Sequence, residues 1–487
     1  MHLLKGTSAL FFAMALAAPV SAVTGIWIRN ILGPEQYGIW LIFSMIFMYG
    51  YYMHLGILDG FSRDVPRLLG EKNIVRVQRL RHIVFTWMTA SGLLAVAFMA
   101  VIIWLPFTRF ETILGIMAFA LIPVQNLALF HNQLHITTQK FKHVAMIQLI
   151  IGSLQYVLMA LFASLYGIYG LFLGVLAGNM IAIVYSTKQI PYKLRLVWDA
   201  GVIKEMFPYG MPIMLIGLLT SLLTTLDRLL VYSFFGAAAA GHYGIIAFVY
   251  QGIMVLPGVF HQIMYPKINY MYGETKEKRR LKAIIIRPAY YMAYASPFFL
   301  GTLLFVFPPF AVLLMPEYTE GIGLSKLIIA GLFFWLWAPL CAQYLIGVNK
   351  QWLYVKILLG AVLVNAGTTS LLAFNGFYLE GAAIGLIVSL VYCSFLVMWA
   401  VLKDMNEKPL YFFKYLAAII HPFILMILLV WCVQLAPIHF FAQAILFCAA
   451  YGLVLIAYSF FLPSFKKGRK RLMKGAVSRL GKRKKSR

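Results

Sequence analysis

Long apolar runs recur along almost the whole chain, and they constrain its fold more than any other feature. A run of about 20 apolar residues can cross the hydrocarbon core of a bilayer as one helix. We count fourteen such runs, near residues 8–28, 37–58, 82–105, 112–131, 143–165, 167–186, 207–235, 242–264, 288–308, 323–347, 352–374, 380–402, 413–435 and 439–461. The sequence therefore predicts an all-α polytopic membrane protein with about 14 transmembrane helices.

The composition excludes a soluble fold. Apolar residues make up 62% of the chain and charged residues 11%, which leaves too little polar surface for a soluble domain. The formal net charge is +26, but a mean hydropathy of +0.85 is untypical of a soluble nucleic-acid-binding protein. We therefore expect the positive charge to face membrane headgroups or an anionic substrate, with no nucleic-acid partner.

Basic residues concentrate in the segments that follow the even-numbered runs, and few charges follow the odd-numbered runs. Because Lys and Arg are enriched in cytoplasmic loops, this pattern predicts a multi-pass membrane protein with both termini in the cytoplasm. Val20-Ser21-Ala22 resembles a leader cleavage site, but the first apolar run continues to Ile28, so we expect no cleaved leader. The basic tail at 464–487 carries twelve Lys or Arg and is expected either to bind anionic lipid headgroups or to act only as a topological anchor.

A repeated motif divides the chain. Leu32-Gly33 and Tyr37-Gly38 follow the first run, and Phe235-Gly236 and Tyr243-Gly244 follow the seventh, each before another run and a basic segment. An even number of runs separates the two copies, so the repeat is parallel. We predict an N-terminal six-helix lobe at 1–190, a cytoplasmic linker at 191–206, a second six-helix lobe at 207–402, an additional C-terminal helix pair at 413–461 and the tail at 464–487.

Four short motifs carry a resemblance to a known family. They are Leu32-Gly33-Pro34-Glu35-x-Tyr37-Gly38, Leu226-Asp227-Arg228-Leu229-Leu230, Pro266 at the end of the eighth run, and Glu380-Gly381-Ala382-Ala383 at the start of the twelfth. With them the chain resembles the polysaccharide transporter family from Lys5 to the last run. These are the O-antigen-type lipid-linked oligosaccharide flippases of the multidrug/oligosaccharidyl-lipid/polysaccharide exporter superfamily. The family commonly has Arg two residues before the first Leu-Gly, where this chain has Asn30 and carries Arg29 one place earlier.

The resemblance implies a transporter and not an enzyme. Two lobes would surround a cationic cavity and use alternating access to move undecaprenyl-pyrophosphate-linked repeat units of an O-antigen, capsule or exopolysaccharide from the cytoplasmic to the periplasmic leaflet. A polysaccharide polymerase and a chain-length regulator are the candidate protein partners. No cofactor is expected, and the sequence does not assign a coupling ion, Na⁺ or H⁺.

Charges inside the runs give the candidate binding residues, because a charge at the centre of a span costs about 2.5–3.5 kcal/mol unless it faces a cavity or a partner. Arg228 either contacts phosphate or sugar, with Asp227 orienting it or binding a cation, or both residues cap the helix end and snorkel. Lys5 and Arg63 either receive the pyrophosphate, with Arg67 beside them, or simply follow the positive-inside rule.

Arg29 either holds the pyrophosphate on the outer side or is a snorkelling residue at the end of its run. The neutral polar residues Gln125, Asn126 and Gln155 either bind sugar or join helices to one another. His131 and His135 share a helix face, but no carboxylate lies nearby in the sequence, so we predict no metal site. The four cysteines lie far apart in apolar runs and are interpreted as ordinary thiols.

Three other functions compete with flipping. Cation-coupled drug efflux uses the same superfamily fold but would favour more carboxylates inside the runs. A membrane glycosyltransferase or polymerase would need a large outer loop, and the longest here, near 308–323, is short. A scaffold that binds synthases through the basic tail is the third alternative. No GxxxxGK[ST] motif for ATP hydrolysis is present in the chain.

Overall fold

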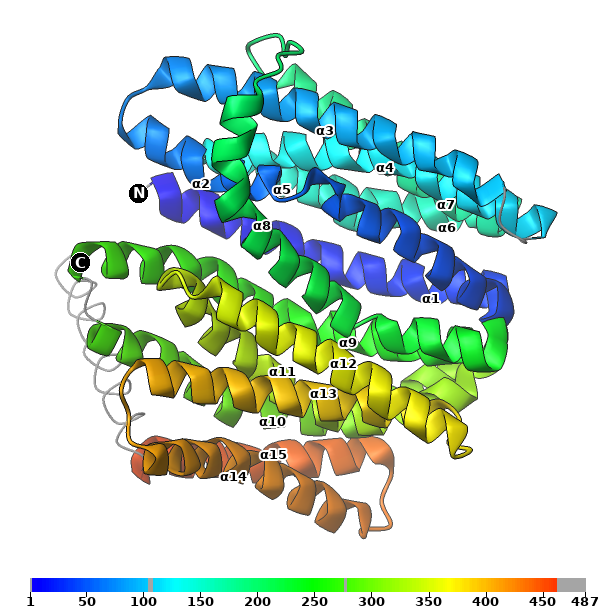
Figure 1. The fold of residues 1–487 in the computed structure, drawn as a ribbon. Coiled ribbons are helices and arrows are strands. Elements are labelled where there is room, and N and C mark those ends of the chain that lie inside the picture. The colour runs from blue at the N-terminus through cyan, green and yellow to red at the C-terminus, as the bar shows by residue number, and fades with distance from the viewer. Residues whose placement is uncertain (1, 104–107, 276–277, 462–487) are drawn as a thin grey trace, which may run out of the picture. The chain divides into compact units, whose positions relative to one another are not determined.

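The computed structural model describes residues 2–103, 108–275 and 278–461, and it describes side chains for these except 2–9, 11, 101–103, 255–275, 278–284 and 459–461. Over these ranges the chain is helical, with no strand (Figure 1). The helices are α1 (His2–Gly50), α2 (Ile57–Gly70), α3 (Ile74–Ile103), α4 (Arg109–Thr137), α5 (Phe141–Leu149), α6 (Gln155–Tyr166), α7 (Ile168–Lys188), α8 (Ala200–Leu223), α9 (Leu226–Thr275), α10 (Lys278–Leu314), α11 (Thr319–Gly347), α12 (Gln351–Phe374), α13 (Leu379–Asp404), α14 (Pro409–Gln434) and α15 (Phe440–Phe461), with short helices η1 (Tyr51–His54), η2 (Ile150–Leu154) and η3 (Pro316–Tyr318).

The predicted fold class is confirmed. Within the described ranges, twelve helices are long and apolar enough to cross a membrane. Two of them, Phe12–His54 and Ala200–Met254, are 43 and 55 residues long, and each is long enough for two crossings of about 20 residues. Counting these two twice gives the predicted fourteen. Exposed apolar side chains support the membrane setting, since Leu93, Leu165 and Leu363 are each more than 60% exposed.

Two long helices bend sharply at glycine, at the two copies of the predicted repeat. Gly33 inside α1 has φ 67° and ψ 173°, and Gly236 inside α9 has φ 86° and ψ −174°. Only glycine adopts this region without steric cost, so one residue turns the chain between two helical segments. Pro34 follows the first glycine at a position where proline starts a helix without losing a hydrogen bond. The repeated motif is therefore a repeated turn.

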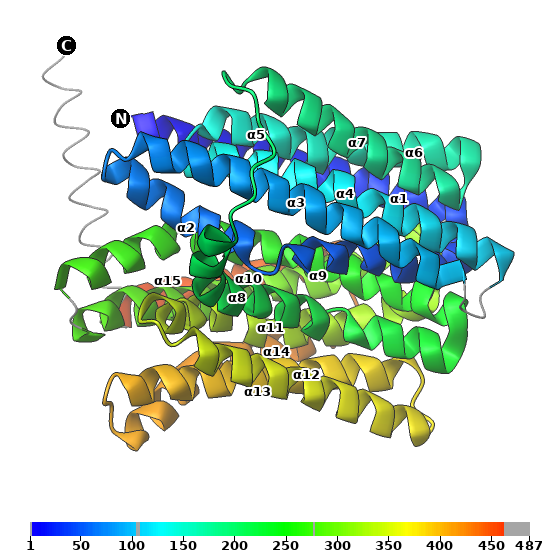
Figure 2. The same ribbon diagram turned by 45° about the horizontal axis from the view of Figure 1, so that its top comes forward.

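The chain forms two compact units. The first contains Met1–Ile253, Leu314–Leu324 and Gln351–Ser389, and the second contains Met254–Leu313, Ser325–Lys350 and Leu390–Arg487. In the first unit α3 lies along α4, and α6 lies along α7 (Figures 1 and 2). The lobe boundaries inferred from the repeat stay a prediction, because compactness and sequence repetition are different properties.

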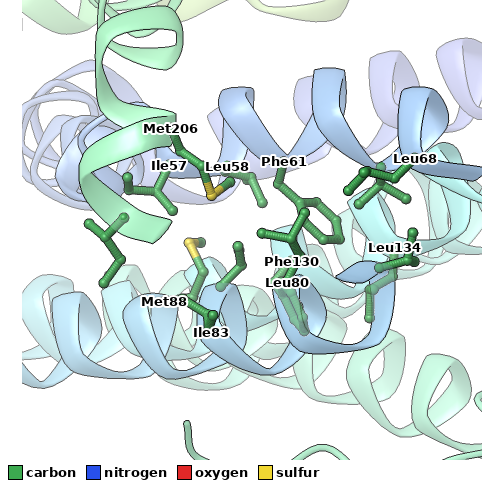
Figure 3. Packing of buried hydrophobic residues seen from close by; sticks show 14 residues of the cluster. Ile57, Leu58, Phe61, Leu68, Leu80, Ile83, Met88, Phe130, Leu134 and Met206 are labelled. Carbon is green, nitrogen blue, oxygen red and sulfur yellow. The ribbon is translucent and has the colours of Figure 1, made fainter. Parts of the chain in front are cut away.

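A hydrophobic core in the first unit joins α2, α3, α4 and α8. Phe61 and Phe130 are fully buried at its centre, with Ile83 from α3 and Met206 from α8 packed around them (Figure 3). Burying such side chains contributes about 1.5–3 kcal/mol each. This core holds the ends of four helices in fixed positions on the side of the unit that carries the basic segments.

The second unit is held by close packing between α10 and α15 and by a polar cluster near Lys350. A Cβ on Gly301 of α10 would come within 2.0 Å of the Phe447 ring, so only glycine fits there. Asp404 accepts a hydrogen bond of 2.6 Å from the Tyr344 hydroxyl and pairs with Lys350. A 94%-buried carboxylate side chain thus has two partners in this unit.

Candidate functional site

The seventh predicted span is interrupted immediately before its two charged residues. Helix α8 ends at Leu223, Thr224 and Thr225 form a turn, and α9 begins at Leu226. The backbone N–H groups of Thr225 and Arg228 donate to the carbonyls of Leu222 and Thr225, each at 3.2 Å, so hydrogen bonding continues through the tighter i to i−3 pattern. Interrupted spans are the usual place where membrane transporters build binding sites.

Neighbouring helices support the interruption. The Asn365 side chain of α12 donates a 3.0 Å hydrogen bond to the Leu223 carbonyl, and the Thr369 hydroxyl donates to Asn365 at 3.1 Å. From α1, the Tyr49 hydroxyl is hydrogen-bonded to the hydroxyl of Thr225. The Asn365 bond satisfies a carbonyl that a continuous helix would have paired internally, and the Tyr49 bond ties the turn to α1. Asn365 therefore has a structural role here.

Asp227 and Arg228 lie just after the turn and are both buried. Asp227 is 1% exposed, and its carboxylate accepts hydrogen bonds from the Tyr243 hydroxyl at 2.7 Å and from the Arg228 backbone N–H at 3.0 Å. Arg228 is 9% exposed, and its Nη2 donates to the Thr224 carbonyl at 3.0 Å. Their burial disagrees with snorkelling, but both side chains bond backbone groups where one helix ends and the next begins, so the capping part of that alternative stays open.

The Arg228 guanidinium has N–H donors that no described residue accepts. It forms no ion pair with a described carboxylate, and its buried Nε has no hydrogen-bond partner among the described residues. A guanidinium has five N–H donors in a planar fork that suits phosphate. Tyr243 holds the adjacent Asp227 from the second segment of α9, and so both charged residues are fixed in position by a single bent helix.

Arg29 is the second buried cation. It is 5% exposed, its Nη1 donates to the Gly25 carbonyl at 2.8 Å, and its guanidinium carbon lies 4.4 Å from the Tyr37 ring centroid and 4.8 Å from that of Phe248. Its Nε is also buried without a described partner. Cation–π contacts stabilise a desolvated guanidinium by about 2 kcal/mol or more and leave its edges free to donate hydrogen bonds.

Arg29 and Asn30 lie on different faces of α1, because successive residues of a helix are about 100° apart. Asn30 is exposed and its side chain donates to the Leu314 carbonyl at 2.8 Å, whereas Arg29 is buried. The Tyr318 hydroxyl donates to the Arg29 carbonyl at 3.1 Å, and its ring packs edge-on against Tyr37 at 6.3 Å. The buried cation next to the first motif is therefore Arg29, although the resembling family commonly has arginine one position later.

Arg29 and Arg228 lie at different depths below the two glycine turns. Arg29 precedes Gly33 by four residues and Arg228 precedes Gly236 by eight, which at 1.5 Å per residue corresponds to about 6 Å and about 12 Å. The turns themselves touch, since a Cβ on Gly241 would lie 1.7 Å from the Pro34 oxygen and one on Gly38 would lie 1.9 Å from the Ala237 oxygen. The two cations thus share a framework made by α1 and α9.

Arg63 and Arg67, two other predicted residues, are not part of this framework. Arg63 on α2 is exposed, pairs with Asp64 at 2.7 Å and lies over the Tyr209 ring at 3.7 Å. Arg67 pairs with Glu71 at 3.4 Å. Lys5 lies in α1, but its side chain is outside the described residues, as is the basic tail. A role for Lys5, Arg63 and Arg67 in receiving substrate stays a prediction.

The neutral polar candidates are distributed among helix contacts. Asn126 is fully buried and donates to the Gly50 carbonyl at 3.4 Å, and Gln155 accepts from Asn179 at 3.5 Å. The Gln125 Oε1 is buried without a hydrogen-bond partner in the described part of the chain. Joining of helices accounts for the bonds of Asn126 and Gln155, but the Asn126 Oδ1, like the Gln125 Oε1, is a buried acceptor without a partner among the described residues.

The two histidines of α4 have ordinary partners. His131 Nδ1 lies 2.8 Å from the Leu127 carbonyl, and His135 Nε2 lies 2.9 Å from the Ser186 hydroxyl. Among the described residues, no group of three or more His, Cys, Asp or Glu side chains could hold a metal ion.

The aromatic residues of the site were not predicted from the sequence. Tyr37, Tyr243, Tyr318 and Phe248 surround or orient the charged side chains, and two of them belong to the repeated Tyr-Gly pair. That pair was used only to align the repeats. The repetition of a tyrosine four or seven residues after a turn glycine was the available signal.

Comparison with solved structures identifies the fold. The chain resembles an inward-facing multidrug resistance MATE family transporter of the MOP superfamily (TM-score 0.66, 13% identity, 82% of this chain and 98% of that one). It also resembles a MOP superfamily transporter from Pyrococcus furiosus (0.64, 12%, 83% and 95%) and the Vibrio cholerae MATE transporter VcmN (0.61, 16%, 84% and 98%). The fold is that of a MOP superfamily transporter.

The family follows from the sequence. A family model described as polysaccharide biosynthesis protein matches residues 29–320, which is more than half of the chain. The chain belongs to this polysaccharide biosynthesis protein family, as the motifs predicted. None of the curated protein sequences compared with the chain matches it.

Proposed function

We propose that the protein is a flippase for lipid-linked oligosaccharides, which carries undecaprenyl-pyrophosphate-linked repeat units across the inner membrane by alternating access and catalyses no covalent chemistry. The observation that carries the proposal is the pair of buried arginines. Arg29 and Arg228 are 5% and 9% exposed, and neither forms an ion pair with a described carboxylate. Burying a cation costs several kcal/mol unless a partner offsets the cost. A pyrophosphate would be such a partner.

The geometry suggests what each group does for an anionic headgroup. Arg228 offers a guanidinium edge at the interrupted span, and Asp227 with Tyr243 fixes the start of α9 so that this edge keeps its direction. Arg29 is held between Tyr37 and Phe248, nearer to its turn. Two cations at different depths can hold a pyrophosphate in succession, which would keep its negative charge compensated during transfer. The basic segments would lie on the cytoplasmic side.

Translocation of a defined substrate tests the proposal. Purified protein in proteoliposomes is given a fluorescent undecaprenyl-pyrophosphate-linked repeat unit, and accessibility to an added reagent reports its leaflet. Arg29→Ala and Arg228→Ala should each abolish transfer, with Arg109→Ala, an exposed arginine at the start of α4, as the control. Wild-type protein that does not move the substrate, in proteoliposomes shown to contain folded protein, would refute the proposal.

Drug efflux is the competing function, because several structural neighbours are described as MATE transporters. A cell assay separates the two functions. Deletion of the gene should remove the surface polysaccharide and leave drug susceptibility unchanged. Raised susceptibility with normal polysaccharide would favour efflux. Complementation with Arg228→Ala at wild-type protein level should leave the polysaccharide absent.

A further inference from the structure

A second cationic pocket lies away from Arg29 and Arg228, at the ends of α3, α4 and α7 next to the basic segments. Its volume is about 270 Å³, and its polar lining consists of Arg81, His135, Thr138, Lys140 and Tyr192. Three apolar residues complete the wall, among them Leu134 of the core in Figure 3. Pockets for drug-sized ligands usually hold about 300–1,000 Å³, so this one suits a smaller group.

One wall of the pocket is made by the segment between α7 and α8, which is bound to α3. The backbone N–H groups of Arg195 and Val197 donate to His82 Nδ1 at 3.1 Å and to the Thr86 hydroxyl at 2.7 Å. Trp198 stacks on Trp87 with ring centroids 5.8 Å apart. The loop is therefore held as a fixed side of the pocket, and it places the Tyr192 ring 5.0 Å from the guanidinium of Arg81.

The charge of the pocket is uncompensated by the protein. Its lining residues include an arginine and a lysine but no carboxylate. On the same helix, Arg76 pairs with Glu205 at 2.8 Å and Arg79 pairs with Asp199. Arg81 forms no ion pair with a described residue, and its buried Nε has no hydrogen-bond partner there. Arg76 and Arg79 are paired with carboxylates and Arg81 is not, so Arg81 keeps a donor that an anion could use.

We propose that this pocket binds a phosphate group, as a site separate from the substrate path. The Arg81 fork suits bidentate contact with phosphate oxygens, Lys140 adds a point charge, and the Tyr192 hydroxyl can donate a further hydrogen bond. Basic pockets between transmembrane helices are a recurrent way to bind anionic lipid headgroups. The phosphate comes either from such a headgroup or from a soluble phosphate, and it links α3, the turn between α4 and α5, and the loop before α8.

Binding to the purified full-length protein tests the site with two probes. Inorganic phosphate is titrated against the protein in neutral detergent at constant ionic strength, and thermal stability is followed. In parallel, nanodiscs of phosphatidylcholine are compared with nanodiscs that contain phosphatidylglycerol. Arg81→Ala and Lys140→Ala should each weaken binding about tenfold to 100-fold, which corresponds to the loss of one charged hydrogen bond. Lys142→Ala, an exposed lysine outside the pocket lining, should bind as the wild type does.

The comparison of the two probes shows where the phosphate group comes from, and the variants show whether it binds in this pocket. Binding of phosphate that both pocket variants lose supports a soluble ligand, and a variant-sensitive effect of phosphatidylglycerol alone supports a headgroup. Lys140 lies in a turn and is exposed, so its truncation does not depend on how the Arg81 variant folds. The proposal is overturned if neither probe stabilises the wild type, or if Lys142→Ala weakens binding as much as Lys140→Ala.

Discussion

Replacing Asp227 and Arg228 together, by asparagine and methionine, should leave the protein at least as stable as the wild type and abolish its transport. Arg228 is 9% exposed, has one hydrogen bond to the Thr224 carbonyl and forms no ion pair with a described residue. Asp227 is 1% exposed, so removal of Arg228 alone would leave a buried carboxylate without its neighbouring positive charge. The double variant removes both charges, and an asparagine side chain at position 227 can still bond the Tyr243 hydroxyl. Replacing both members of a buried pair of charges by uncharged groups is often neutral or gains about 1–4 kcal/mol.

Thermal unfolding in detergent, followed by tryptophan fluorescence, measures the change. For a chain of 487 residues, 1 kcal/mol corresponds to about 1 °C, so the Tm of Asp227→Asn/Arg228→Met should rise by about 0–4 °C. The control is Arg63→Met, because the Arg63 side chain is 41% exposed and paired with Asp64, so its replacement should change stability by about 0–1 kcal/mol. A Tm clearly below that of the wild type would show that the two charged residues are held by favourable contacts within the protein. Undiminished transfer of lipid-linked substrate by the double variant would remove both residues from the transport site.

Three further changes test the framework around the site. Gly241→Ala would place a Cβ 1.7 Å from the backbone oxygen of the facing helical segment and should strongly reduce the yield of folded protein. The control is Gly367→Ala, which has open space around it and should be neutral or gain about 1 kcal/mol of stability. Equal yields of the two variants would contradict the close approach of the two segments. Tyr243→Phe removes a donor to the buried Asp227 and should cost about 1.5–3 kcal/mol, measured as a lower Tm. Asp59 lies outside the membrane spans, and burial raises its pKa to about 7. Between about pH 4 and 7 the native protein therefore holds a proton on Asp59 that the unfolded chain has lost, so stability should fall as the pH rises through this range and then level off. Asp59→Asn should flatten this fall, and an unchanged Tm-against-pH curve would assign it to other groups.

The apolar runs predicted the transmembrane helices well because length and hydropathy alone decide whether a helix can cross a bilayer. The glycine turns were also visible, since Gly33 and Gly236 stand at matching places in the two copies of the motif. Their local conformation depends on a single residue type and so needs no knowledge of distant contacts. These parts of the fold were predictable from local sequence.

The details of the site were less predictable because they depend on distant partners. Thr224 and Thr225 belong to an uninterrupted apolar run in the sequence, and the break there is supported by Asn365 from a helix far along the chain. Similarly, the sequence cannot distinguish a snorkelling Arg29 from a buried one, because its burial depends on Phe248. The sequence shows that Arg63 and Asp64 are adjacent. The geometry of their ion pair depends on the helix and on the contact of Arg63 with Tyr209.

The single-residue turns at Gly33 and Gly236 have a consequence for membrane insertion. A long loop would let the first helix of a pair enter the bilayer while the second still lay in water. Here one glycine joins two helical segments directly, and the first of these glycines, Gly33, is followed by Pro34. No stretch of polar chain separates the two segments, so we expect the segments on either side of each glycine to enter the membrane together as a hairpin. The first hairpin carries Arg29 and the second carries Arg228. Each charged residue would therefore enter the bilayer at the same time as both segments of its hairpin, and not on a single isolated helix.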